Sequence, residues 1–190
     1  MIDDYFIQEQ INKYVSKDEK LIWRGRPKQG IVLRKSDIFM IPFSIMWGGF
    51  ALFWETTALI EFFKEDSNMP IIFPLFGIPF VLVGIYFMVG RFWADAKRRE
   101  KTYYGLTDKR ILIISGILNQ SVKSMDVLRL PELTLSEEAD GRGTITFGQK
   151  NPWNWFDGMP FPGMGNYMPS MFETIDNAKD VYQKIRELSL

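Results

Sequence analysis

The feature that most constrains this chain is an uncharged stretch of 22 residues, Met69 to Gly90, in a sequence of which 24% is charged. One helix of that length would span about 33 Å at roughly 1.5 Å per residue, enough to cross a hydrocarbon core of about 30 Å. A second uncharged run of 17 residues, Ile38 to Trp54, precedes it, and a polar connector at residues 61–68 separates the two. The pattern predicts a transmembrane hairpin at residues 36–92, with helices at about 38–60 and 69–91.

The alternative to a membrane hairpin is a buried helical pair of a soluble protein. It is disfavoured because soluble helices rarely extend over 22 residues without a charge. Small residues predict where the two helices touch, since they let backbones approach closely. These residues are Gly48, Gly49 and Ala51 in the first run and Gly77, Gly84 and Gly90 in the second. Glu55 is expected near the far interface, with a functional carboxylate inside the membrane as the other reading.

Basic residues flank the outer ends of the hairpin and are scarce in the connector, where Lys64 stands alone. They are Arg24, Arg26, Lys28, Arg34 and Lys35 before the hairpin, and Arg91, Lys97, Arg98, Arg99 and Lys101 after it. Positive charge accumulates on the cytoplasmic side of membrane proteins. We therefore expect a multi-pass protein of the cytoplasmic (inner) membrane with both termini in the cytoplasm. The five residues after the hairpin are predicted to contact lipid headgroups, where each basic residue contributes up to about 1 kcal/mol.

Composition excludes several kinds of chemistry. The chain has no cysteine, so disulfides, thiolate metal sites and cysteine nucleophiles are absent. It has no histidine either, which removes Ser-His hydrolysis, histidine-ligated zinc and imidazole proton shuttles. We expect no cofactor and no metal. The net charge is zero, so no nucleic-acid partner is expected.

Residues 1–35 are predicted to form a cytoplasmic segment with a short helix and a strand. The sequence starts with Asp3 and Asp4 where a signal peptide would be basic, so we expect no cleaved signal. An amphipathic helix at about residues 3–15 would either pack on the soluble domain or lie on the membrane surface. A strand follows near Lys20, with Trp23 as its expected buried anchor.

Residues 93–190 are predicted to form a cytoplasmic domain. Short β-rich segments at roughly ten-residue spacing, including Arg110 to Ser115, are typical of a small antiparallel barrel or sandwich. A helix at residues 171–188 would close the chain, with Ser170 and Glu173 as a capping box. The predicted fold class is therefore α+β: a two-helix transmembrane hairpin plus a small antiparallel β-barrel or sandwich capped by a C-terminal helix.

A long segment from Gln149 to Pro169 is rich in proline, glycine, methionine and aromatic residues. So many helix and strand breakers predict a loop, and loops of this length are often functional. Its large side chains either pack over the barrel or form a surface for a membrane or a partner. The candidates for such a surface are Trp153, Trp155, Phe156 and Met164.

Four pieces of the chain resemble one family. The run Tyr104 to Arg110, YGLTDKR, resembles the Y-x-L-T-x-x-R opening of bacterial pleckstrin-homology-like (PH-like) domains. GRGTITFG at Gly141 to Gly148 is similar to that family's late glycine-bounded strand, and FETIDNAKDVYQKI is similar to its closing helix. EKLIWRGRP at Glu19 to Pro27 resembles the opening of membrane-anchored members, which place a two-helix hairpin before the domain. The resemblance implies a split β-barrel capped by a C-terminal helix, and it implies no catalytic residue and no particular ligand.

Three functions remain open from the sequence. The first is a membrane-anchored adaptor whose domain binds a protein or a lipid headgroup. Its candidate contacts are Lys109, Arg110, Lys123, Arg129 and Arg142, together with the aromatic loop residues, although Arg110 could equally satisfy carbonyls at a strand start. The second is a small subunit of a transporter or another membrane complex, assembled or self-associated through the hairpin. The third is a membrane enzyme using carboxylates, because Glu137, Glu138 and Asp140 cluster near Arg142, but on a turn such a cluster is more often a solvated charged tip.

Overall fold

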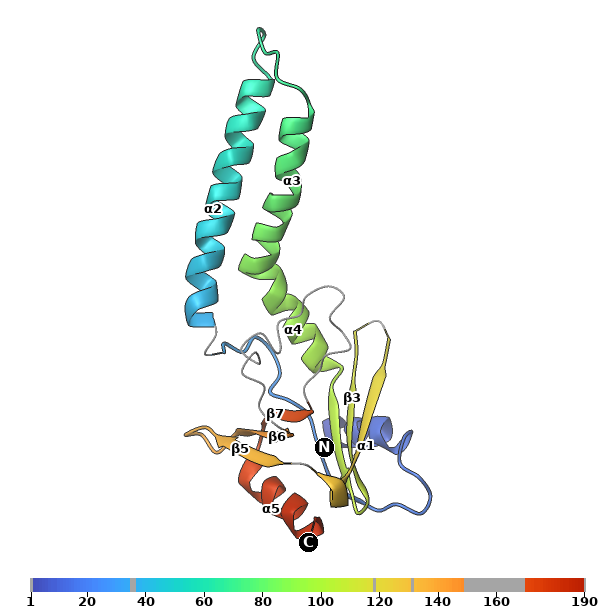
Figure 1. Cartoon of the computed structure of the whole chain (residues 1–190). Coiled ribbons are helices and arrows are strands. Elements are labelled where there is room, and N and C mark those ends of the chain that lie inside the picture. The colour runs from blue at the N-terminus through green and yellow to red at the C-terminus, as the bar shows by residue number, and fades with distance from the viewer. Residues whose placement is uncertain (1, 35–36, 118, 131, 149–169, 190) are drawn as a thin grey trace. The chain divides into compact units, whose positions relative to one another are not determined.

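The computed structural model describes residues 2–34, 37–117, 119–130, 132–148 and 170–189 (Figure 1). The chain divides into two compact units, one formed by Met1–Val32 with Asp95–Leu190, the other by Leu33–Ala94. This differs from the sequence-based division, which treated residues 1–35 as a separate segment. The first residues belong to the same unit as the C-terminal half, and the hairpin is an insertion within that unit.

The inserted unit is a pair of antiparallel helices (Figure 1). Helix α2 (Asp37–Phe62) is followed by α3 (Ile72–Ile85), one turn of π-helix η1 (Tyr86–Gly90) and α4 (Arg91–Glu100). Two continuous helices, Asp37–Phe62 and Ile72–Glu100, are long and apolar enough to cross a membrane. They indicate membrane association. The second helix starts three residues later and extends nine residues further than the predicted 69–91, because the charged sequence after Gly90 is itself a good helix former.

Glycine sets the spacing of α2 and α3. A Cβ atom built on Gly84 would lie 3.0 Å from the Cα atom of Gly48, so the two backbones meet directly at this level. At Gly77 the added atom would collide with Oε2 of Glu55, so this glycine makes room for the carboxyl group. Gly49 faces open space, and the side chain nearest to Gly90 belongs to Tyr86 on its own turn. Three of the five predicted glycines therefore make the contact.

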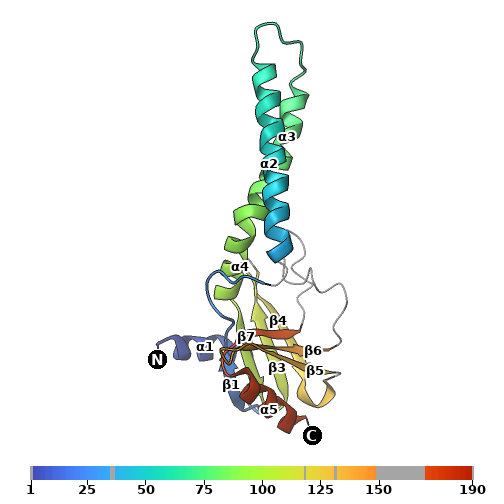
Figure 2. The same ribbon diagram turned by 90° about the vertical axis from the view of Figure 1, so that its left-hand side faces the viewer.

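The other unit contains a four-stranded antiparallel sheet in the order β1-β2-β3-β4. Its strands are β1 (Leu21–Gly25), β2 (Tyr103–Thr107), β3 (Arg110–Ser115) and β4 (Ser121–Asp126). The hairpin lies in the sequence between β1 and β2, yet these strands are hydrogen-bonded neighbours, with Gly25 opposite Tyr104. The chain thus leaves the sheet after one strand and returns to form the adjacent one (Figure 2).

A second antiparallel sheet has the order β5-β6-β7. After the 3-10 turn η2 (Val127–Arg129) come β5 (Leu133–Glu137), β6 (Gly143–Phe147) and β7 (Met171–Ile175), and helix α5 (Ala178–Leu188) follows. The fold class is α+β, as predicted, with two separate sheets and a C-terminal helix; the described strands do not close into a barrel.

The start of the C-terminal helix was predicted wrongly. Residues 171–175 form β7 rather than the first turns of a helix, so Ser170 and Glu173 are not a capping box. The turn into α5 instead uses Asn177 in the left-handed conformation, with φ of 51°. Phe172 and Ile175, read as part of a helical stripe, are fully buried from strand positions.

Two apolar cores hold this unit together. Between the sheets and α5, one face of β2 and β3 packs on β6, β7 and the helix. Its buried members are Tyr104, Leu106, Ile111, Ile113, Val127, Ile145, Phe147, Phe172, Ile175, Ala178, Val181 and Ile185, and the partly buried Trp23 packs against them. On the opposite face of the first sheet lies α1 (Ile2–Asn12), whose Ile7 and Ile11 pack on Tyr103, Leu112 and Ile114. The N-terminal helix therefore packs on the soluble domain, the first of the two predicted alternatives.

Candidate functional site: the Arg99 cluster

Arg99 is the largest fully buried side chain of the described residues, with its side chain 1% exposed. Its Nε donates to Oδ2 of Asp95 at 2.8 Å, and its Nη2 donates to Oε1 of Glu173 at 3.0 Å. Its Nη1 reaches the carbonyl oxygen of Lys28 at 3.4 Å. Burial alone lowers the pKa of Arg99, but the charges of Glu173 and Asp95 raise it above its ordinary value, so the guanidinium stays charged.

The same cluster fixes the chain on both sides of the hairpin. The Gln29 amide nitrogen donates to the carbonyl oxygens of Pro27 at 2.7 Å and Arg99 at 3.1 Å. The backbone N–H of Lys28 donates to the carbonyl of Thr174 on β7 at 3.1 Å. The segment that leads to the hairpin, the helix that returns from it and β7 are therefore tied around one buried arginine.

Two further side chains complete the cluster. Arg98 donates to Oδ1 of Asp95 at 2.8 Å and lies 3.9 Å from Oε2 of Glu173. The Tyr104 hydroxyl accepts the backbone N–H of Glu173 at 3.2 Å. Burial, and then the charge of Glu173, raise the pKa of Tyr104 far above its usual 10.0, so this hydroxyl stays protonated. The cluster therefore joins β2, β7, α4 and the segment that leads to the hairpin.

The basic residues predicted to contact lipid headgroups have different surroundings. Arg99 is enclosed by protein and, in this position, cannot reach a headgroup, which corrects its proposed role. Arg98 is mostly buried in the same cluster. Lys97 forms a surface ion pair with Glu100 at 2.9 Å, and Lys101 donates to the carbonyl of Ile117 at 2.9 Å. Arg91 belongs to the hairpin unit, where it pairs with Asp37 at 2.7 Å.

The Y-x-L-T-x-x-R run forms a second cluster, at the turn between β2 and β3. Arg110 pairs with Glu19 at 2.9 Å and donates to the carbonyl oxygen of Tyr14 at 2.9 Å. The Thr107 hydroxyl oxygen accepts the backbone N–H of Arg110 at 2.9 Å, which fixes the turn. Lys109 pairs with Asp18, and this hydrogen bond raises the pKa of Lys109. Arg110 therefore fastens the N-terminal segment to the sheet, in line with the structural alternative for this residue.

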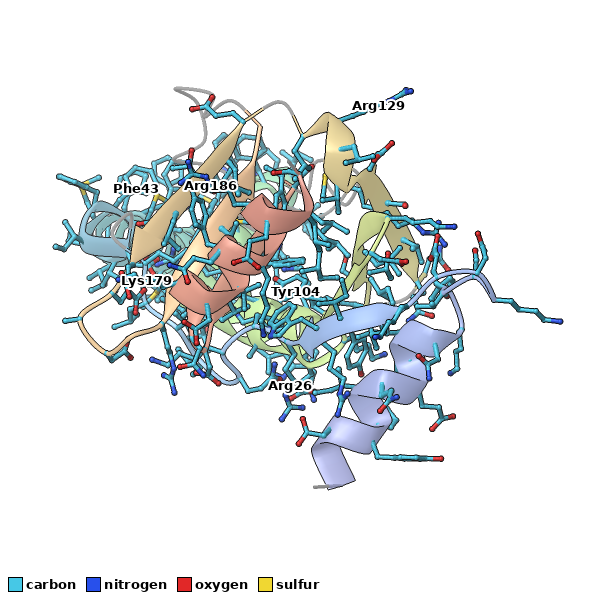
Figure 3. All side chains as sticks on the ribbon, turned by 90° about the horizontal axis from the view of Figure 1, so that it is seen from below. Arg26, Phe43, Tyr104, Arg129, Lys179 and Arg186 are labelled. Carbon is cyan, nitrogen blue, oxygen red and sulfur yellow. The ribbon has the colours of Figure 1, made fainter. Side chains whose placement is uncertain are left out.

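The other predicted basic contacts lie on three separate elements. Lys123 is exposed on the edge strand β4. Arg129, in η2, is 87% exposed and lies 3.8 Å from Asp126; Figure 3 shows it pointing away from the strands. Arg142 pairs with Asp176 at 2.9 Å, and this hydrogen bond raises the pKa of Arg142. Trp153, Trp155, Phe156 and Met164 lie outside the described residues.

Sequence reasoning missed the acidic partners that organise these clusters. Asp95 and Arg99 have the i,i+4 spacing of a helical ion pair, which the sequence already offered as a signal. Glu173 and Asp37 had no such signal, because each meets its arginine across more than fifty residues. Among the described residues, no group of three or more side chains could hold a metal ion.

Comparisons of the chain with protein-family models, with curated proteins and with solved structures find no match.

Proposed function

We propose that this protein is a membrane-anchored binding module without catalysis, whose two-sheet unit recognises a protein partner or a lipid headgroup at the cytoplasmic face. The hairpin crosses the membrane twice, and both termini lie in the cytoplasm. This topology follows from the basic flanks of the hairpin and the single lysine in its connector.

The observation that best supports this proposal is the insertion of the hairpin between β1 and β2. The two-sheet unit is joined to the hairpin by two chain segments, one after β1 and one before β2. Within the unit, the Arg99 cluster holds both segments. Two covalent connections to a membrane hairpin would keep the unit at the membrane, which suits an adaptor.

Membership of the PH-like family is part of this proposal. Two antiparallel sheets with a C-terminal helix agree with the split barrel and closing helix that the resemblance implies. The Y-x-L-T-x-x-R run forms a strand-turn-strand unit in which its threonine and arginine fix the turn. These features support membership of the family as a proposal about the fold. The family does not identify the ligand, which depends on the surface residues of this chain.

A second candidate function is a subunit of a membrane complex that assembles through the hairpin. An apolar groove of about 260 Å³ on the hairpin favours it. The groove is lined by Trp47, Phe50, Ala51, Trp54, Phe76 and Phe80. In this case the hairpin, and not the two-sheet unit, would carry the partner contacts.

Co-purification from detergent-solubilised membranes separates the two functions. The intact chain is compared with a hairpin-free version in which residues 1–30 are joined by a short glycine-serine linker to residues 95–190, because β1 and β2 are neighbours. A fragment of residues 93–190 is the matched control; it lacks β1 and α1 and should not fold stably. The adaptor proposal expects the hairpin-free version to retain the partners of the intact chain. Partners that bind only the intact chain would contradict it and favour the subunit.

A further inference from the structure

The end of the hairpin where α2 begins and η1 ends holds a buried ion pair with an unused donor. Arg91 is 6% exposed and Asp37 is 6% exposed. Arg91 Nη1 donates to Oδ1 of Asp37 at 2.7 Å, and its Nε donates to the carbonyl of Phe87 at 2.9 Å. Its Nη2 is buried and has no hydrogen-bond partner among the described residues. An unpartnered buried donor of a charged group is costly, so an oxygen acceptor bound there would stabilise Arg91.

Arg91 Nη2 makes no hydrogen bond to Asp37. The second oxygen of Asp37, Oδ2, already accepts the backbone N–H of Arg34 at 2.6 Å. The Cζ atom of Arg91 lies 4.3 Å from the centre of the Phe92 ring, so one face of the guanidinium packs on this ring. Nη2 is the guanidinium nitrogen that has no hydrogen bond among the described residues.

A second unused donor lies one turn away. The Tyr86 hydroxyl is also buried without a partner among the described residues. The two residues are linked through the π-turn, because the backbone N–H of Arg91 donates to the carbonyl of Tyr86. A π-turn shifts the following side chains relative to an α-helix and often marks a functional site. The guanidinium of Arg91 and the hydroxyl of Tyr86 stand on successive turns of one helix, and both groups donate hydrogen bonds to oxygen anions.

We propose that Arg91 Nη2 and the Tyr86 hydroxyl form a binding site for a phosphate group, supplied by the headgroup of a membrane phospholipid. Guanidinium groups match phosphate oxygens in charge and geometry. Asp37 is the first residue of α2, and Arg91 follows directly after the uncharged run 69–90. Both residues therefore lie at the ends of apolar helices, where a proposed membrane helix meets the lipid headgroups. Both donors are covered by neighbouring side chains, so binding requires a small side-chain movement.

The site rests on the proposed membrane anchoring and adds to it a specific lipid contact. The full chain is purified in a maltoside detergent, which contains no phosphate, and lipid retention is measured by native mass spectrometry. The probes are phosphatidylglycerol, a diacylglycerol with the same acyl chains, and inorganic phosphate. We expect retention of phosphatidylglycerol and not of the diacylglycerol. Arg91→Lys and Tyr86→Phe should each weaken retention about tenfold, the effect of losing one hydrogen bond of about 1.4 kcal/mol.

Controls and outcomes separate the alternatives. Arg186→Lys and Tyr5→Phe, at exposed positions in the other unit, should retain phosphatidylglycerol as the parent chain does. Displacement of the lipid by inorganic phosphate would support the phosphate site and show that free phosphate also fills it. Equal retention of the diacylglycerol, or unchanged retention by both variants, would overturn the site. If Arg91→Lys does not fold, Tyr86→Phe decides, since it removes only the hydroxyl.

Failure of this site is distinguishable from failure of the proposed function. Membranes that contain the chain are washed with alkaline carbonate, which strips peripheral proteins. A chain that stays in the membrane but shows no phosphate selectivity contradicts only the lipid site. A chain that leaves the membrane contradicts the anchoring on which both proposals rest.

Discussion

Arg99 is central to the two-sheet unit because its three contacts belong to distant parts of the chain. Its guanidinium donates to Asp95, to Glu173 and to the carbonyl of Lys28. A buried ion pair adds little stability compared with an apolar replacement of the whole set, but removing one partner leaves uncompensated charge. The cluster thus fixes the two chain segments that lead to and from the hairpin. Removing one of its members should lower the free energy of unfolding.

Arg99→Met should destabilise the protein by about 3–5 kcal/mol, because Asp95 and Glu173 would lose the buried charge of Arg99 and keep Arg98 as a cationic neighbour. Urea unfolding of the full chain in detergent, followed by tryptophan fluorescence, measures the change. Arg186→Met on the exposed surface of α5 is the matched control and should stay within about 0.5 kcal/mol. A loss below about 1 kcal/mol for Arg99→Met would show that the cluster is not a structural clamp.

Tyr104 gives a pH-dependent prediction. Its pKa in the folded state is raised above the unfolded value of 10.0, so its contribution to stability is present below pH 10 and is lost as the pH rises beyond it. Tyr104→Phe removes the acceptor for the Glu173 N–H and should cost about 1–2 kcal/mol at pH 8. The stability gap between the two proteins should narrow between pH 8 and pH 11. A gap that stays constant over this range would contradict the buried, protonated hydroxyl.

At the scale of elements, the hairpin depends on the close contact of Gly48 with Gly84. Gly84→Leu should force α2 and α3 apart and destabilise the hairpin by about 1–3 kcal/mol, as overpacking does. Gly49→Leu adds the same side chain where no atom lies within 4 Å, and it should be tolerated. Unfolding in increasing dodecyl sulfate, monitored by circular dichroism, compares them. Equal effects of the two substitutions would refute the close contact between the helices.

The elements that depend on local pattern were predicted well from the sequence. The two apolar runs predicted α2 and α3, the β-rich run Arg110 to Ser115 predicted β3, and the glycine-bounded run at residues 141–148 predicted β6. Residues 171–175 were misread because Phe172 and Ile175 suit a helical stripe and a buried strand equally. Tertiary pairing with β6 decides for the strand, since Ile145 lies opposite Phe172. The left-handed Asn177 then starts the helix later than the pattern indicates.

Contacts between residues that are distant in the sequence could not be predicted from local sequence patterns. The pairing of β1 with β2 spans the whole hairpin, so no local signal could show that residues 1–32 belong to the same unit as residues 95–190. Asp37 and Glu173, the distant acidic partners of Arg91 and Arg99, could not be predicted for the same reason. The candidate residues were chosen for their positive charge, and several, led by Arg99 and Arg110, turned out to be engaged in holding the fold.

At the scale of the whole molecule, the proposed arrangement is a cytoplasmic two-sheet unit interrupted by a membrane hairpin. Two regions of the chain should therefore lie on opposite sides of the membrane: the connector between α2 and α3, and the exposed edge strand β4. Ser67 is in the connector, and Ser121 is an exposed residue of β4. Because the chain has no cysteine, a single introduced cysteine reports its own position without background.

Labelling of single cysteines with a membrane-impermeant maleimide in right-side-out vesicles tests this arrangement most directly. Ser67→Cys should label in intact vesicles, because the connector lies outside. Ser121→Cys should label only after the vesicles are permeabilised, because the two-sheet unit lies inside. Labelling of Ser121→Cys in intact vesicles, with Ser67→Cys protected until permeabilisation, would reverse the topology and contradict a cytoplasmic binding module.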